Sequence, residues 1–112
     1  MDNCIFCKIM NGEIPTTKVY EDAYCFAFKD IEPMAPQHFL VIPREHITSV
    51  ADATGANADV IAHIFVVIAK LAKELEFTNG YRVVTNCGPD AGQTVMHMHF
   101  HVLAGKTLGS FN

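Results

Sequence analysis

The sequence predicts an α+β domain with a five-stranded, mostly antiparallel sheet, one long helix and one short helix. Two observations predict this class. Short β-rich runs bounded by turn residues recur along the chain, and only the stretch 57–76 carries apolar residues at the spacing of a long helix. A chain of 112 residues can bury one core but not two, so we expect a single domain over residues 1–112.

The individual elements follow from local signals. A short helix over 4–10 should end at Asn11-Gly12. The long helix over 57–76 has Asn57 as its N-cap and Asn79-Gly80 as its stop. The expected strands cover residues 18–20, 24–29, 39–42, 81–85 and 95–103.

Composition and charge exclude several classes of protein. Half of the residues are hydrophobic and 18% are charged, which excludes an intrinsically disordered chain. Eight Lys and Arg against 12 Asp and Glu give a net charge of −4, so a nucleic-acid polymer is not an expected partner. The N-terminus shows no signal-peptide pattern, and the most apolar stretch is too short to span a bilayer. We therefore expect a cytoplasmic protein without a membrane partner, also nuclear if its source is eukaryotic.

The four cysteines are expected to be reduced in that compartment. The pair Cys4-x-x-Cys7 is then interpreted as metal-binding or redox-active. Cys25 and Cys87 have no partner at metal-binding spacing and are expected to be packing residues.

Three histidines at every second position mark the expected last strand. In a strand, His97, His99 and His101 share one face, and the apolar residues between them face the other way. Three interpretations are open: chance, a three-histidine zinc site with a bound water, and an imidazole nucleophile supported by its neighbours. We favour the nucleophile, because a row of imidazoles does little for a core.

The residues before this row favour attack at phosphorus. Gly92-Gln93-Thr94 supplies a flexible turn, an amide and a hydroxyl, and Asn86 adds a second amide; these groups can bond phosphoryl oxygens. The histidine strand contains no Asp or Glu, which weakens the case for a metal hydrolase.

Residues 97–103 read His-φ-His-φ-His-φ-φ, where φ is apolar, and so resemble the signature of the histidine-triad (HIT) family at every position. The resemblance covers nearly the whole chain and also includes residues 5–6, 13–15, 27–31, 38–43, 80–82 and 92–95. Gln93-Thr94-Val95 and the short length look most like the Hint branch, the nucleoside phosphoramidases. The diadenosine-polyphosphate hydrolase branch is similar but generally longer at its C-terminus.

The resemblance implies three roles for the histidines. His99 would attack the α-phosphorus of a nucleotide and form a nucleotidyl-histidine that water hydrolyses. His101 would stabilise the charge on the phosphate oxygens. His97 would fix the tautomer of His99 through its backbone carbonyl.

The resemblance also implies a site for a purine mononucleotide such as AMP. Asn86, Gly92, Gln93 and Thr94 would contact the phosphate side, and Asp30 would hold the ribose hydroxyls. The apolar base slot would consist of Ile5, Phe6, Ile9, Phe28, Ile31 and Leu40. Each assignment has an ordinary alternative, since Asp30 could cap a turn and slot residues could be core.

A structural zinc ion is implied in the same way. Cys4, Cys7, His46 and His97 occupy the positions with which many relatives bind one zinc, a set suited to tetrahedral coordination. Free buried thiols or a redox dithiol are the alternatives. No cofactor is expected for catalysis. The chain has no Trp where several relatives carry one near the C-terminus, a place that Phe111 could take.

The function that the resemblance implies is hydrolysis of the P–N bond of adenosine 5′-phosphoramidates. The resemblance adds a homodimer in which two sheets join into ten strands. Two alternatives stay open: a diadenosine-polyphosphate hydrolase, and a nucleotide-binding regulatory protein with incidental turnover.

Overall fold

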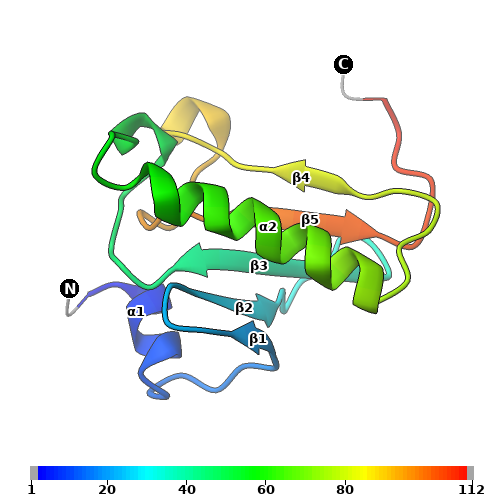
Figure 1. Ribbon diagram of the computed structural model, residues 1–112, viewed down its shortest axis with the longest axis horizontal. Coiled ribbons are helices and arrows are strands. Elements are labelled where there is room, and N and C mark those ends of the chain that lie inside the picture. The colour runs from blue at the N-terminus through cyan, green and yellow to red at the C-terminus, as the bar shows by residue number, and fades with distance from the viewer. Residues whose placement is uncertain (1–2, 111–112) are drawn as a thin grey trace.

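The computed structural model describes residues 3–110 and contains one sheet of five strands in the order β1-β2-β3-β5-β4 (Figure 1). Every strand pair is antiparallel, so the expected α+β class and the sheet are confirmed. The strands are β1 (Lys18–Glu21), β2 (Cys25–Lys29), β3 (Gln37–Pro43), β4 (Arg82–Val84) and β5 (Phe100–Ala104). The helices are α1 (Ile5–Met10) and α2 (Ala58–Glu74), with short 3-10 turns at Val50–Asp52 and Pro89–Ala91. Phe111 lies outside the described residues, and within residues 3–110 no helix is long and apolar enough to cross a membrane.

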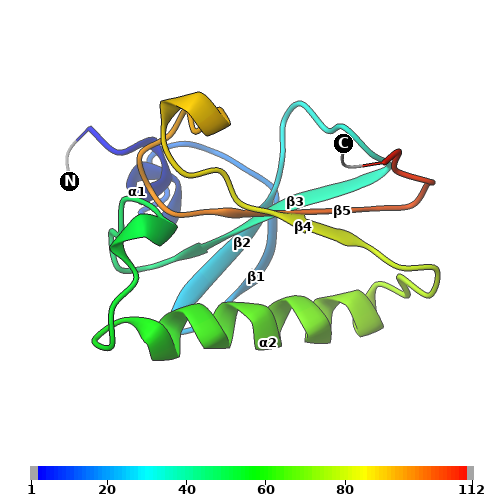
Figure 2. The ribbon, with the colours of Figure 1, turned by 90° about the horizontal axis from the view of Figure 1, so that it is seen from above.

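The central strands are buried on both faces of the sheet. Figure 2 shows α2 along one face and α1 beyond the other. In β2, Cys25 and Ala27 join the core under α2, whereas Phe26 and Phe28 join a second core that includes Phe6 of α1. This alternation is the period-two geometry of a strand. The sheet therefore carries a helix-covered core on one side and has a separate apolar layer on the other.

Helix α2 ends two residues earlier than expected. Glu76 adopts a left-handed conformation with φ of 61°, and the N–H of Phe77 donates to the carbonyl of Ala72 at 2.9 Å. This bond closes the last turn in the manner of a Schellman cap. At the other end Asn57 is the N-cap residue, but its side chain makes no capping bond.

The last strand begins at Phe100, not at residue 95 as predicted. The preceding backbone finds partners outside a regular ladder. The N–H of Met98 donates to the carbonyl of Ile47 at 2.6 Å, and the carbonyl of His99 accepts the hydroxyl of Thr85 at 2.8 Å. On β3, Pro43 has no N–H to continue the pairing, and its carbonyl accepts from the side chain of His97 at 2.8 Å.

A carboxylate fastens the turn between β1 and β2 to α2. Nε2 of His63 on α2 lies 2.6 Å from the carboxylate of Asp22. The hydroxyl of Tyr20 and the backbone N–H groups of Tyr24 and Cys25 also donate to this carboxylate. Although burial opposes ionisation, these hydrogen bonds hold the pKa of Asp22 well below its ordinary value.

Candidate functional site

A cavity of about 490 Å³ lies on the face of the sheet opposite α2. Eleven of the predicted nucleotide residues line it: Ile5, Phe6, Ile9, Phe28, Asp30, Ile31, Leu40, Gly92, Thr94, His99 and His101. The cavity also contains residues that the sequence interpretation missed, namely Ile14, Pro15, Thr16, Lys29 and Val95. Its wall is thus mainly apolar, with two imidazoles and one carboxylate.

The ring of His99 is fixed in one tautomer. Its Nδ1 lies 2.7 Å from the backbone carbonyl of His97. Because a carbonyl oxygen can only accept, Nδ1 carries the proton and Nε2 of the neutral ring keeps its lone pair. His99 is only 5% exposed, yet it lines the cavity. In its neutral form the ring therefore offers the unprotonated Nε2 to a ligand in the cavity.

His38 fixes the other cavity histidine. Nδ1 of His38 accepts the backbone N–H of Met34 at 3.1 Å, so the proton of the neutral His38 ring is on Nε2. That nitrogen lies 2.9 Å from Nδ1 of His101, which must accept. The proton of His101 is consequently on Nε2, where it is available to an anion.

Burial is the largest cause that lowers the pKa of His101, to about 4, and the neighbouring His99 and His38 rings add to it. The neutral ring is therefore the form present near pH 7. The two residues are 63 positions apart, and they meet because β3 pairs with β5. No local pattern in the sequence indicates this contact.

Asp30 serves the turn and the cavity together. One carboxylate oxygen accepts the backbone N–H of Glu32 at 2.8 Å, which is the turn-capping role considered for this residue. The other oxygen lies 3.4 Å from Nε2 of His38 and the residue lines the cavity. The turn cap is thus present, and the same carboxylate lies where it could reach a ligand in the cavity.

Gln93 and Asn86 do not line the cavity. The side chain of Gln93 is buried, where it accepts from the N–H of Gly88 at 2.9 Å and donates to the carbonyls of Thr48 and Val95 at 2.7 and 3.0 Å. The amide of Asn86 donates to the carbonyl of Ala91 at 2.7 Å. In this structure both amides hold the loop before the histidine row, and Gly92 and Thr94 lie at the cavity itself.

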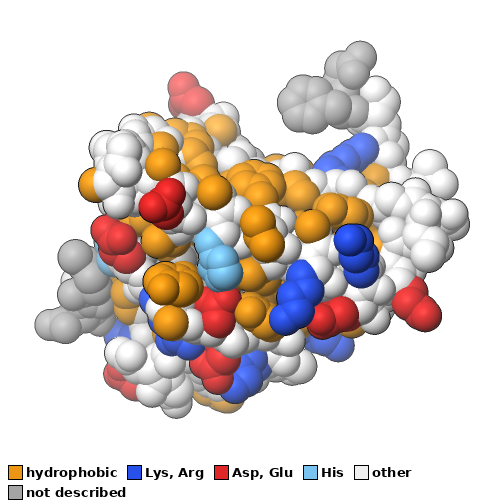
Figure 3. Space-filling model, viewed as in Figure 1, with side chains coloured by type: hydrophobic (Ala, Val, Ile, Leu, Met, Phe, Trp, Pro, Cys, Tyr) orange, Lys and Arg blue, Asp and Glu red, His pale blue; other side chains and the backbone are white. Residues whose placement is uncertain are grey.

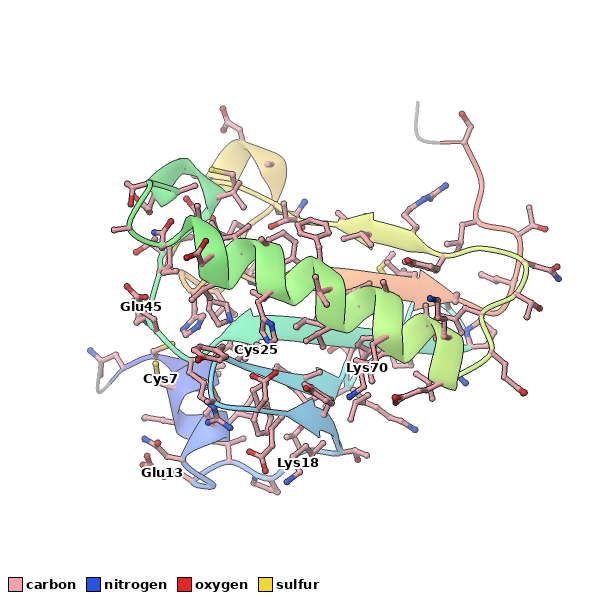
Figure 4. All side chains as sticks on the ribbon, in the orientation of Figure 1. Cys7, Glu13, Lys18, Cys25, Glu45 and Lys70 are labelled. Atoms are coloured by element: carbon pink, nitrogen blue, oxygen red, sulfur yellow. The ribbon has the colours of Figure 1, made fainter. Side chains whose placement is uncertain are left out.

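The four predicted metal ligands meet in one cluster, which we call the Cys–His cluster (Cys4, Cys7, His46 and His97). All of their ligand atoms lie within 4.8 Å of one another. Nδ1 of His97 is 3.3 Å from Sγ of Cys4 and 3.7 Å from Sγ of Cys7. Figure 4 shows Cys7 on α1 beside the segment after β3 that carries Glu45, and Nδ1 of His46 in that segment is 3.6 Å from Sγ of Cys7.

The chemistry of the cluster fits a zinc-type ion. Nε2 of His97 donates to the carbonyl of Pro43, so its Nδ1 points a lone pair at the sulfurs, as a metal ligand requires. Burial, followed by the neighbouring Cys4 thiol, raises the pKa of Cys7 to about 11. The free thiol is therefore protonated, and an ion would have to displace that proton to bind.

The remaining cysteines differ from each other. Cys25 is fully buried, as expected of a packing residue. Cys87 is exposed and its Sγ donates to the hydroxyl of Ser49 at 3.4 Å, so the expectation that it packs in the core is wrong.

Comparison with known proteins agrees with this geometry. The family model of the HIT domain matches residues 11–108. The chain belongs to the HIT family. The match includes the histidine row but begins after Cys4 and Cys7, so half of the Cys–His cluster lies outside the matched part of the HIT domain.

Solved HIT proteins share this fold over most of their length. A histidine triad protein from Clostridium difficile is 54% identical, with a TM-score of 0.94 over 100% of this chain and 97% of that chain. A HIT family hydrolase from Clostridium thermocellum is 46% identical, with a TM-score of 0.94 over 98% and 96%. A histidine triad nucleotide-binding protein from Candida albicans is 36% identical, with a TM-score of 0.83 over 96% and 82%.

Proposed function

We propose that this HIT domain hydrolyses the P–N bond of adenosine 5′-phosphoramidates and belongs to the Hint branch. The observation that carries the proposal is the fixed tautomer of His99, whose Nε2 lone pair is available in an apolar cavity. An imidazole in this state can attack phosphorus without first losing a proton. Two of the solved relatives, a HIT family hydrolase and a histidine triad nucleotide-binding protein, support the same class.

The reaction we propose has two steps. Nε2 of His99 forms a bond to the α-phosphorus while the P–N bond breaks; the electron pair of that bond goes to the nitrogen, which takes a proton from water and leaves as the amine. Water then attacks the nucleotidyl-histidine, which releases AMP and frees the imidazole. During both steps Nε2–H of His101 donates to a phosphoryl oxygen and stabilises the developing charge, and His97 keeps the His99 ring in its tautomer through the 2.7 Å bond.

The rest of the nucleotide would fill the cavity. Asp30 accepts from the ribose hydroxyls, and Gly92 and Thr94 lie on the phosphate side. Gln93 and Asn86 would act there by shaping the loop, because the Gln93 amide bonds Gly88, Thr48 and Val95 and the Asn86 amide donates to Ala91. The purine would lie against the apolar wall of Ile5, Phe6, Ile9, Phe28, Ile31 and Leu40.

We further propose that the Cys–His cluster holds one structural zinc ion and that the chemistry at phosphorus needs no cofactor. Two thiolates and two imidazoles are the donor set of closed tetrahedral zinc sites. When bound, the ion would supply cross-links between α1, the segment after β3 and the histidine row.

A homodimer is the proposed assembly. Strand β4 lies at one edge of the sheet, and edge strands need cover. Figure 3 shows hydrophobic side chains gathered over α2 and β4, and Phe65, Val66 and Tyr81 are 48%, 65% and 41% exposed. A second copy placed on this face would join the sheets into ten strands. We also propose that the protein is cytoplasmic and has no membrane or nucleic-acid partner.

The proposal is tested by comparing rates on two substrates. We expect hydrolysis of adenosine 5′-phosphoramidate with a higher kcat/KM than hydrolysis of diadenosine tetraphosphate. The variant His63→Ala, a histidine on α2 outside the cavity lining, should keep this preference. A higher kcat/KM on the dinucleotide would establish the diadenosine-polyphosphate hydrolase instead. AMP binding without turnover of either compound would establish a nucleotide-binding protein.

A further inference from the structure

Helix α1 is shared by the Cys–His cluster and the cavity. Cys4 is its N-cap residue and Cys7 lies within it. The same six-residue helix carries Ile5, Phe6 and Ile9 of the cavity wall. A movement of α1 therefore changes the metal ligands and the base slot together.

The histidine row provides a second connection. One side of His97 faces the cluster, with Nδ1 3.3 Å from Sγ of Cys4. The backbone carbonyl of the same residue accepts from Nδ1 of His99 at 2.7 Å, and His99 lines the cavity. The ring of Phe6 contacts the rings of both His97 and His99, at centroid distances of 5.9 and 5.1 Å.

Few buried contacts hold α1 in place. Phe6 is its only buried residue, Ile9 and Met10 pack against the second core while only partly buried, and isolated helices of this length are unstable in water. The contacts between the cluster atoms are 3.3–3.7 Å long, which makes each a weak hydrogen bond for a thiol. Metal–ligand bonds would replace these contacts with a rigid cross-link from α1 to His46 and His97.

We propose that a zinc-type ion in the Cys–His cluster and a nucleotide in the cavity reinforce each other's binding through α1 and His97. The inference rests on the proposed nucleotide site and adds an effector to it. The ion fixes the wall and the His97 carbonyl that the nucleotide needs, and the nucleotide fixes the helix that the ion needs. Thermodynamic linkage makes the effect reciprocal, and couplings of this kind are about 5- to 150-fold in affinity.

Two titrations of the wild-type chain under reducing conditions test the coupling. One measures the Kd for Zn²⁺, by chelator competition, with and without saturating AMP. The other measures the Kd for AMP, by calorimetry, with and without Zn²⁺. We expect each ligand to lower the Kd of the other by the same factor, at least about 5-fold. Two affinities that do not depend on each other would overturn the inference, whereas a chain that binds no AMP would overturn the proposed function.

Hydrogen exchange separates a local effect from loss of the fold. After removal of zinc, we expect the amides of α1 to lose protection while those of α2 keep it. An unfolded zinc-free chain would contradict the inference, since the ion would then act on the whole domain.

A pair of matched substitutions gives a further check. The Cys7→Ser variant should bind AMP with the affinity of the zinc-free wild type, and added Zn²⁺ should not change that affinity. Cys87→Ser makes the same change at a cysteine outside the cluster, and it should retain the full response. Equal responses in the two variants would contradict a role for the cluster.

Discussion

Replacing Gln93 by alanine tests whether this side chain holds the loop before the histidine row. The side chain is 5% exposed and makes three hydrogen bonds, with the N–H of Gly88 and the carbonyls of Thr48 and Val95. Each bond contributes about 1 kcal/mol, and leaving these part-buried partner groups unpaired adds to the loss. We therefore expect Gln93→Ala to lower the free energy of unfolding by about 2–4 kcal/mol.

Urea unfolding followed by circular dichroism measures this loss. With an m-value of about 1.5 kcal/mol/M, the midpoint should fall by roughly 1.3–2.7 M. Gln37→Ala removes an exposed glutamine at the start of β3 and should change the free energy of unfolding by no more than about 0.5 kcal/mol. Identical midpoints for the two variants would refute the assignment of Gln93 to the loop.

Three other predictions follow from single side chains. His38→Phe removes the donor that fixes the His101 tautomer, so kcat on adenosine 5′-phosphoramidate should fall at least about 10-fold. His38→Gln retains a donor and should recover part of the lost kcat. Full activity of the His38→Phe variant would contradict this role of His38. The pKa of His101 is lowered from 6.5 to about 4 in the folded protein. As the pH falls, the unfolded chain therefore takes up this proton at a higher pH than the folded protein, and the free energy of unfolding decreases between pH 6.5 and pH 4. His101→Asn should reduce that decrease by on the order of 3 kcal/mol in urea unfolding at pH 6.5 and 4, and an unchanged pH dependence would disprove it. Asp22→Asn should lower the free energy of unfolding by about 2 kcal/mol at pH 7. Because the pKa of Asp22 is lowered in the folded protein, the difference in free energy of unfolding between variant and wild type should become smaller below pH 3.8 and stay constant above it.

The fold was predictable wherever one element carries its own signal. The apolar stripe of α2 repeats every three or four residues, and the apolar runs of β2 and β3 involve residues two positions apart, so both signals are local in the sequence. The start of β5 could not be predicted in this way. It depends on Pro43, Ile47 and Thr85, which satisfy the backbone of residues 98–99 and the ring of His97 from distant parts of the chain.

The residues of the site also fall into those that local sequence patterns predict and those that depend on contacts between distant segments. The spacing of His97, His99 and His101 and the family resemblance predicted eleven of the cavity residues and the four members of the Cys–His cluster. The pairing of His38 with His101 and the inward hydrogen bonds of Gln93 could not be read from the sequence. Both depend on which residues of remote segments face each other, and no local pattern specifies that.

The most direct test of the central claim is to trap the bond to His99. Wild-type protein is mixed with adenosine 5′-phosphoramidate labelled at phosphorus, quenched within one turnover, digested and analysed by mass spectrometry. We expect a nucleotidyl group on the peptide that contains His99, label on the protein at early times, and neither in His99→Ala, with His63→Ala behaving as wild type. Turnover with no label on that peptide, or equal turnover in His99→Ala, would contradict the account.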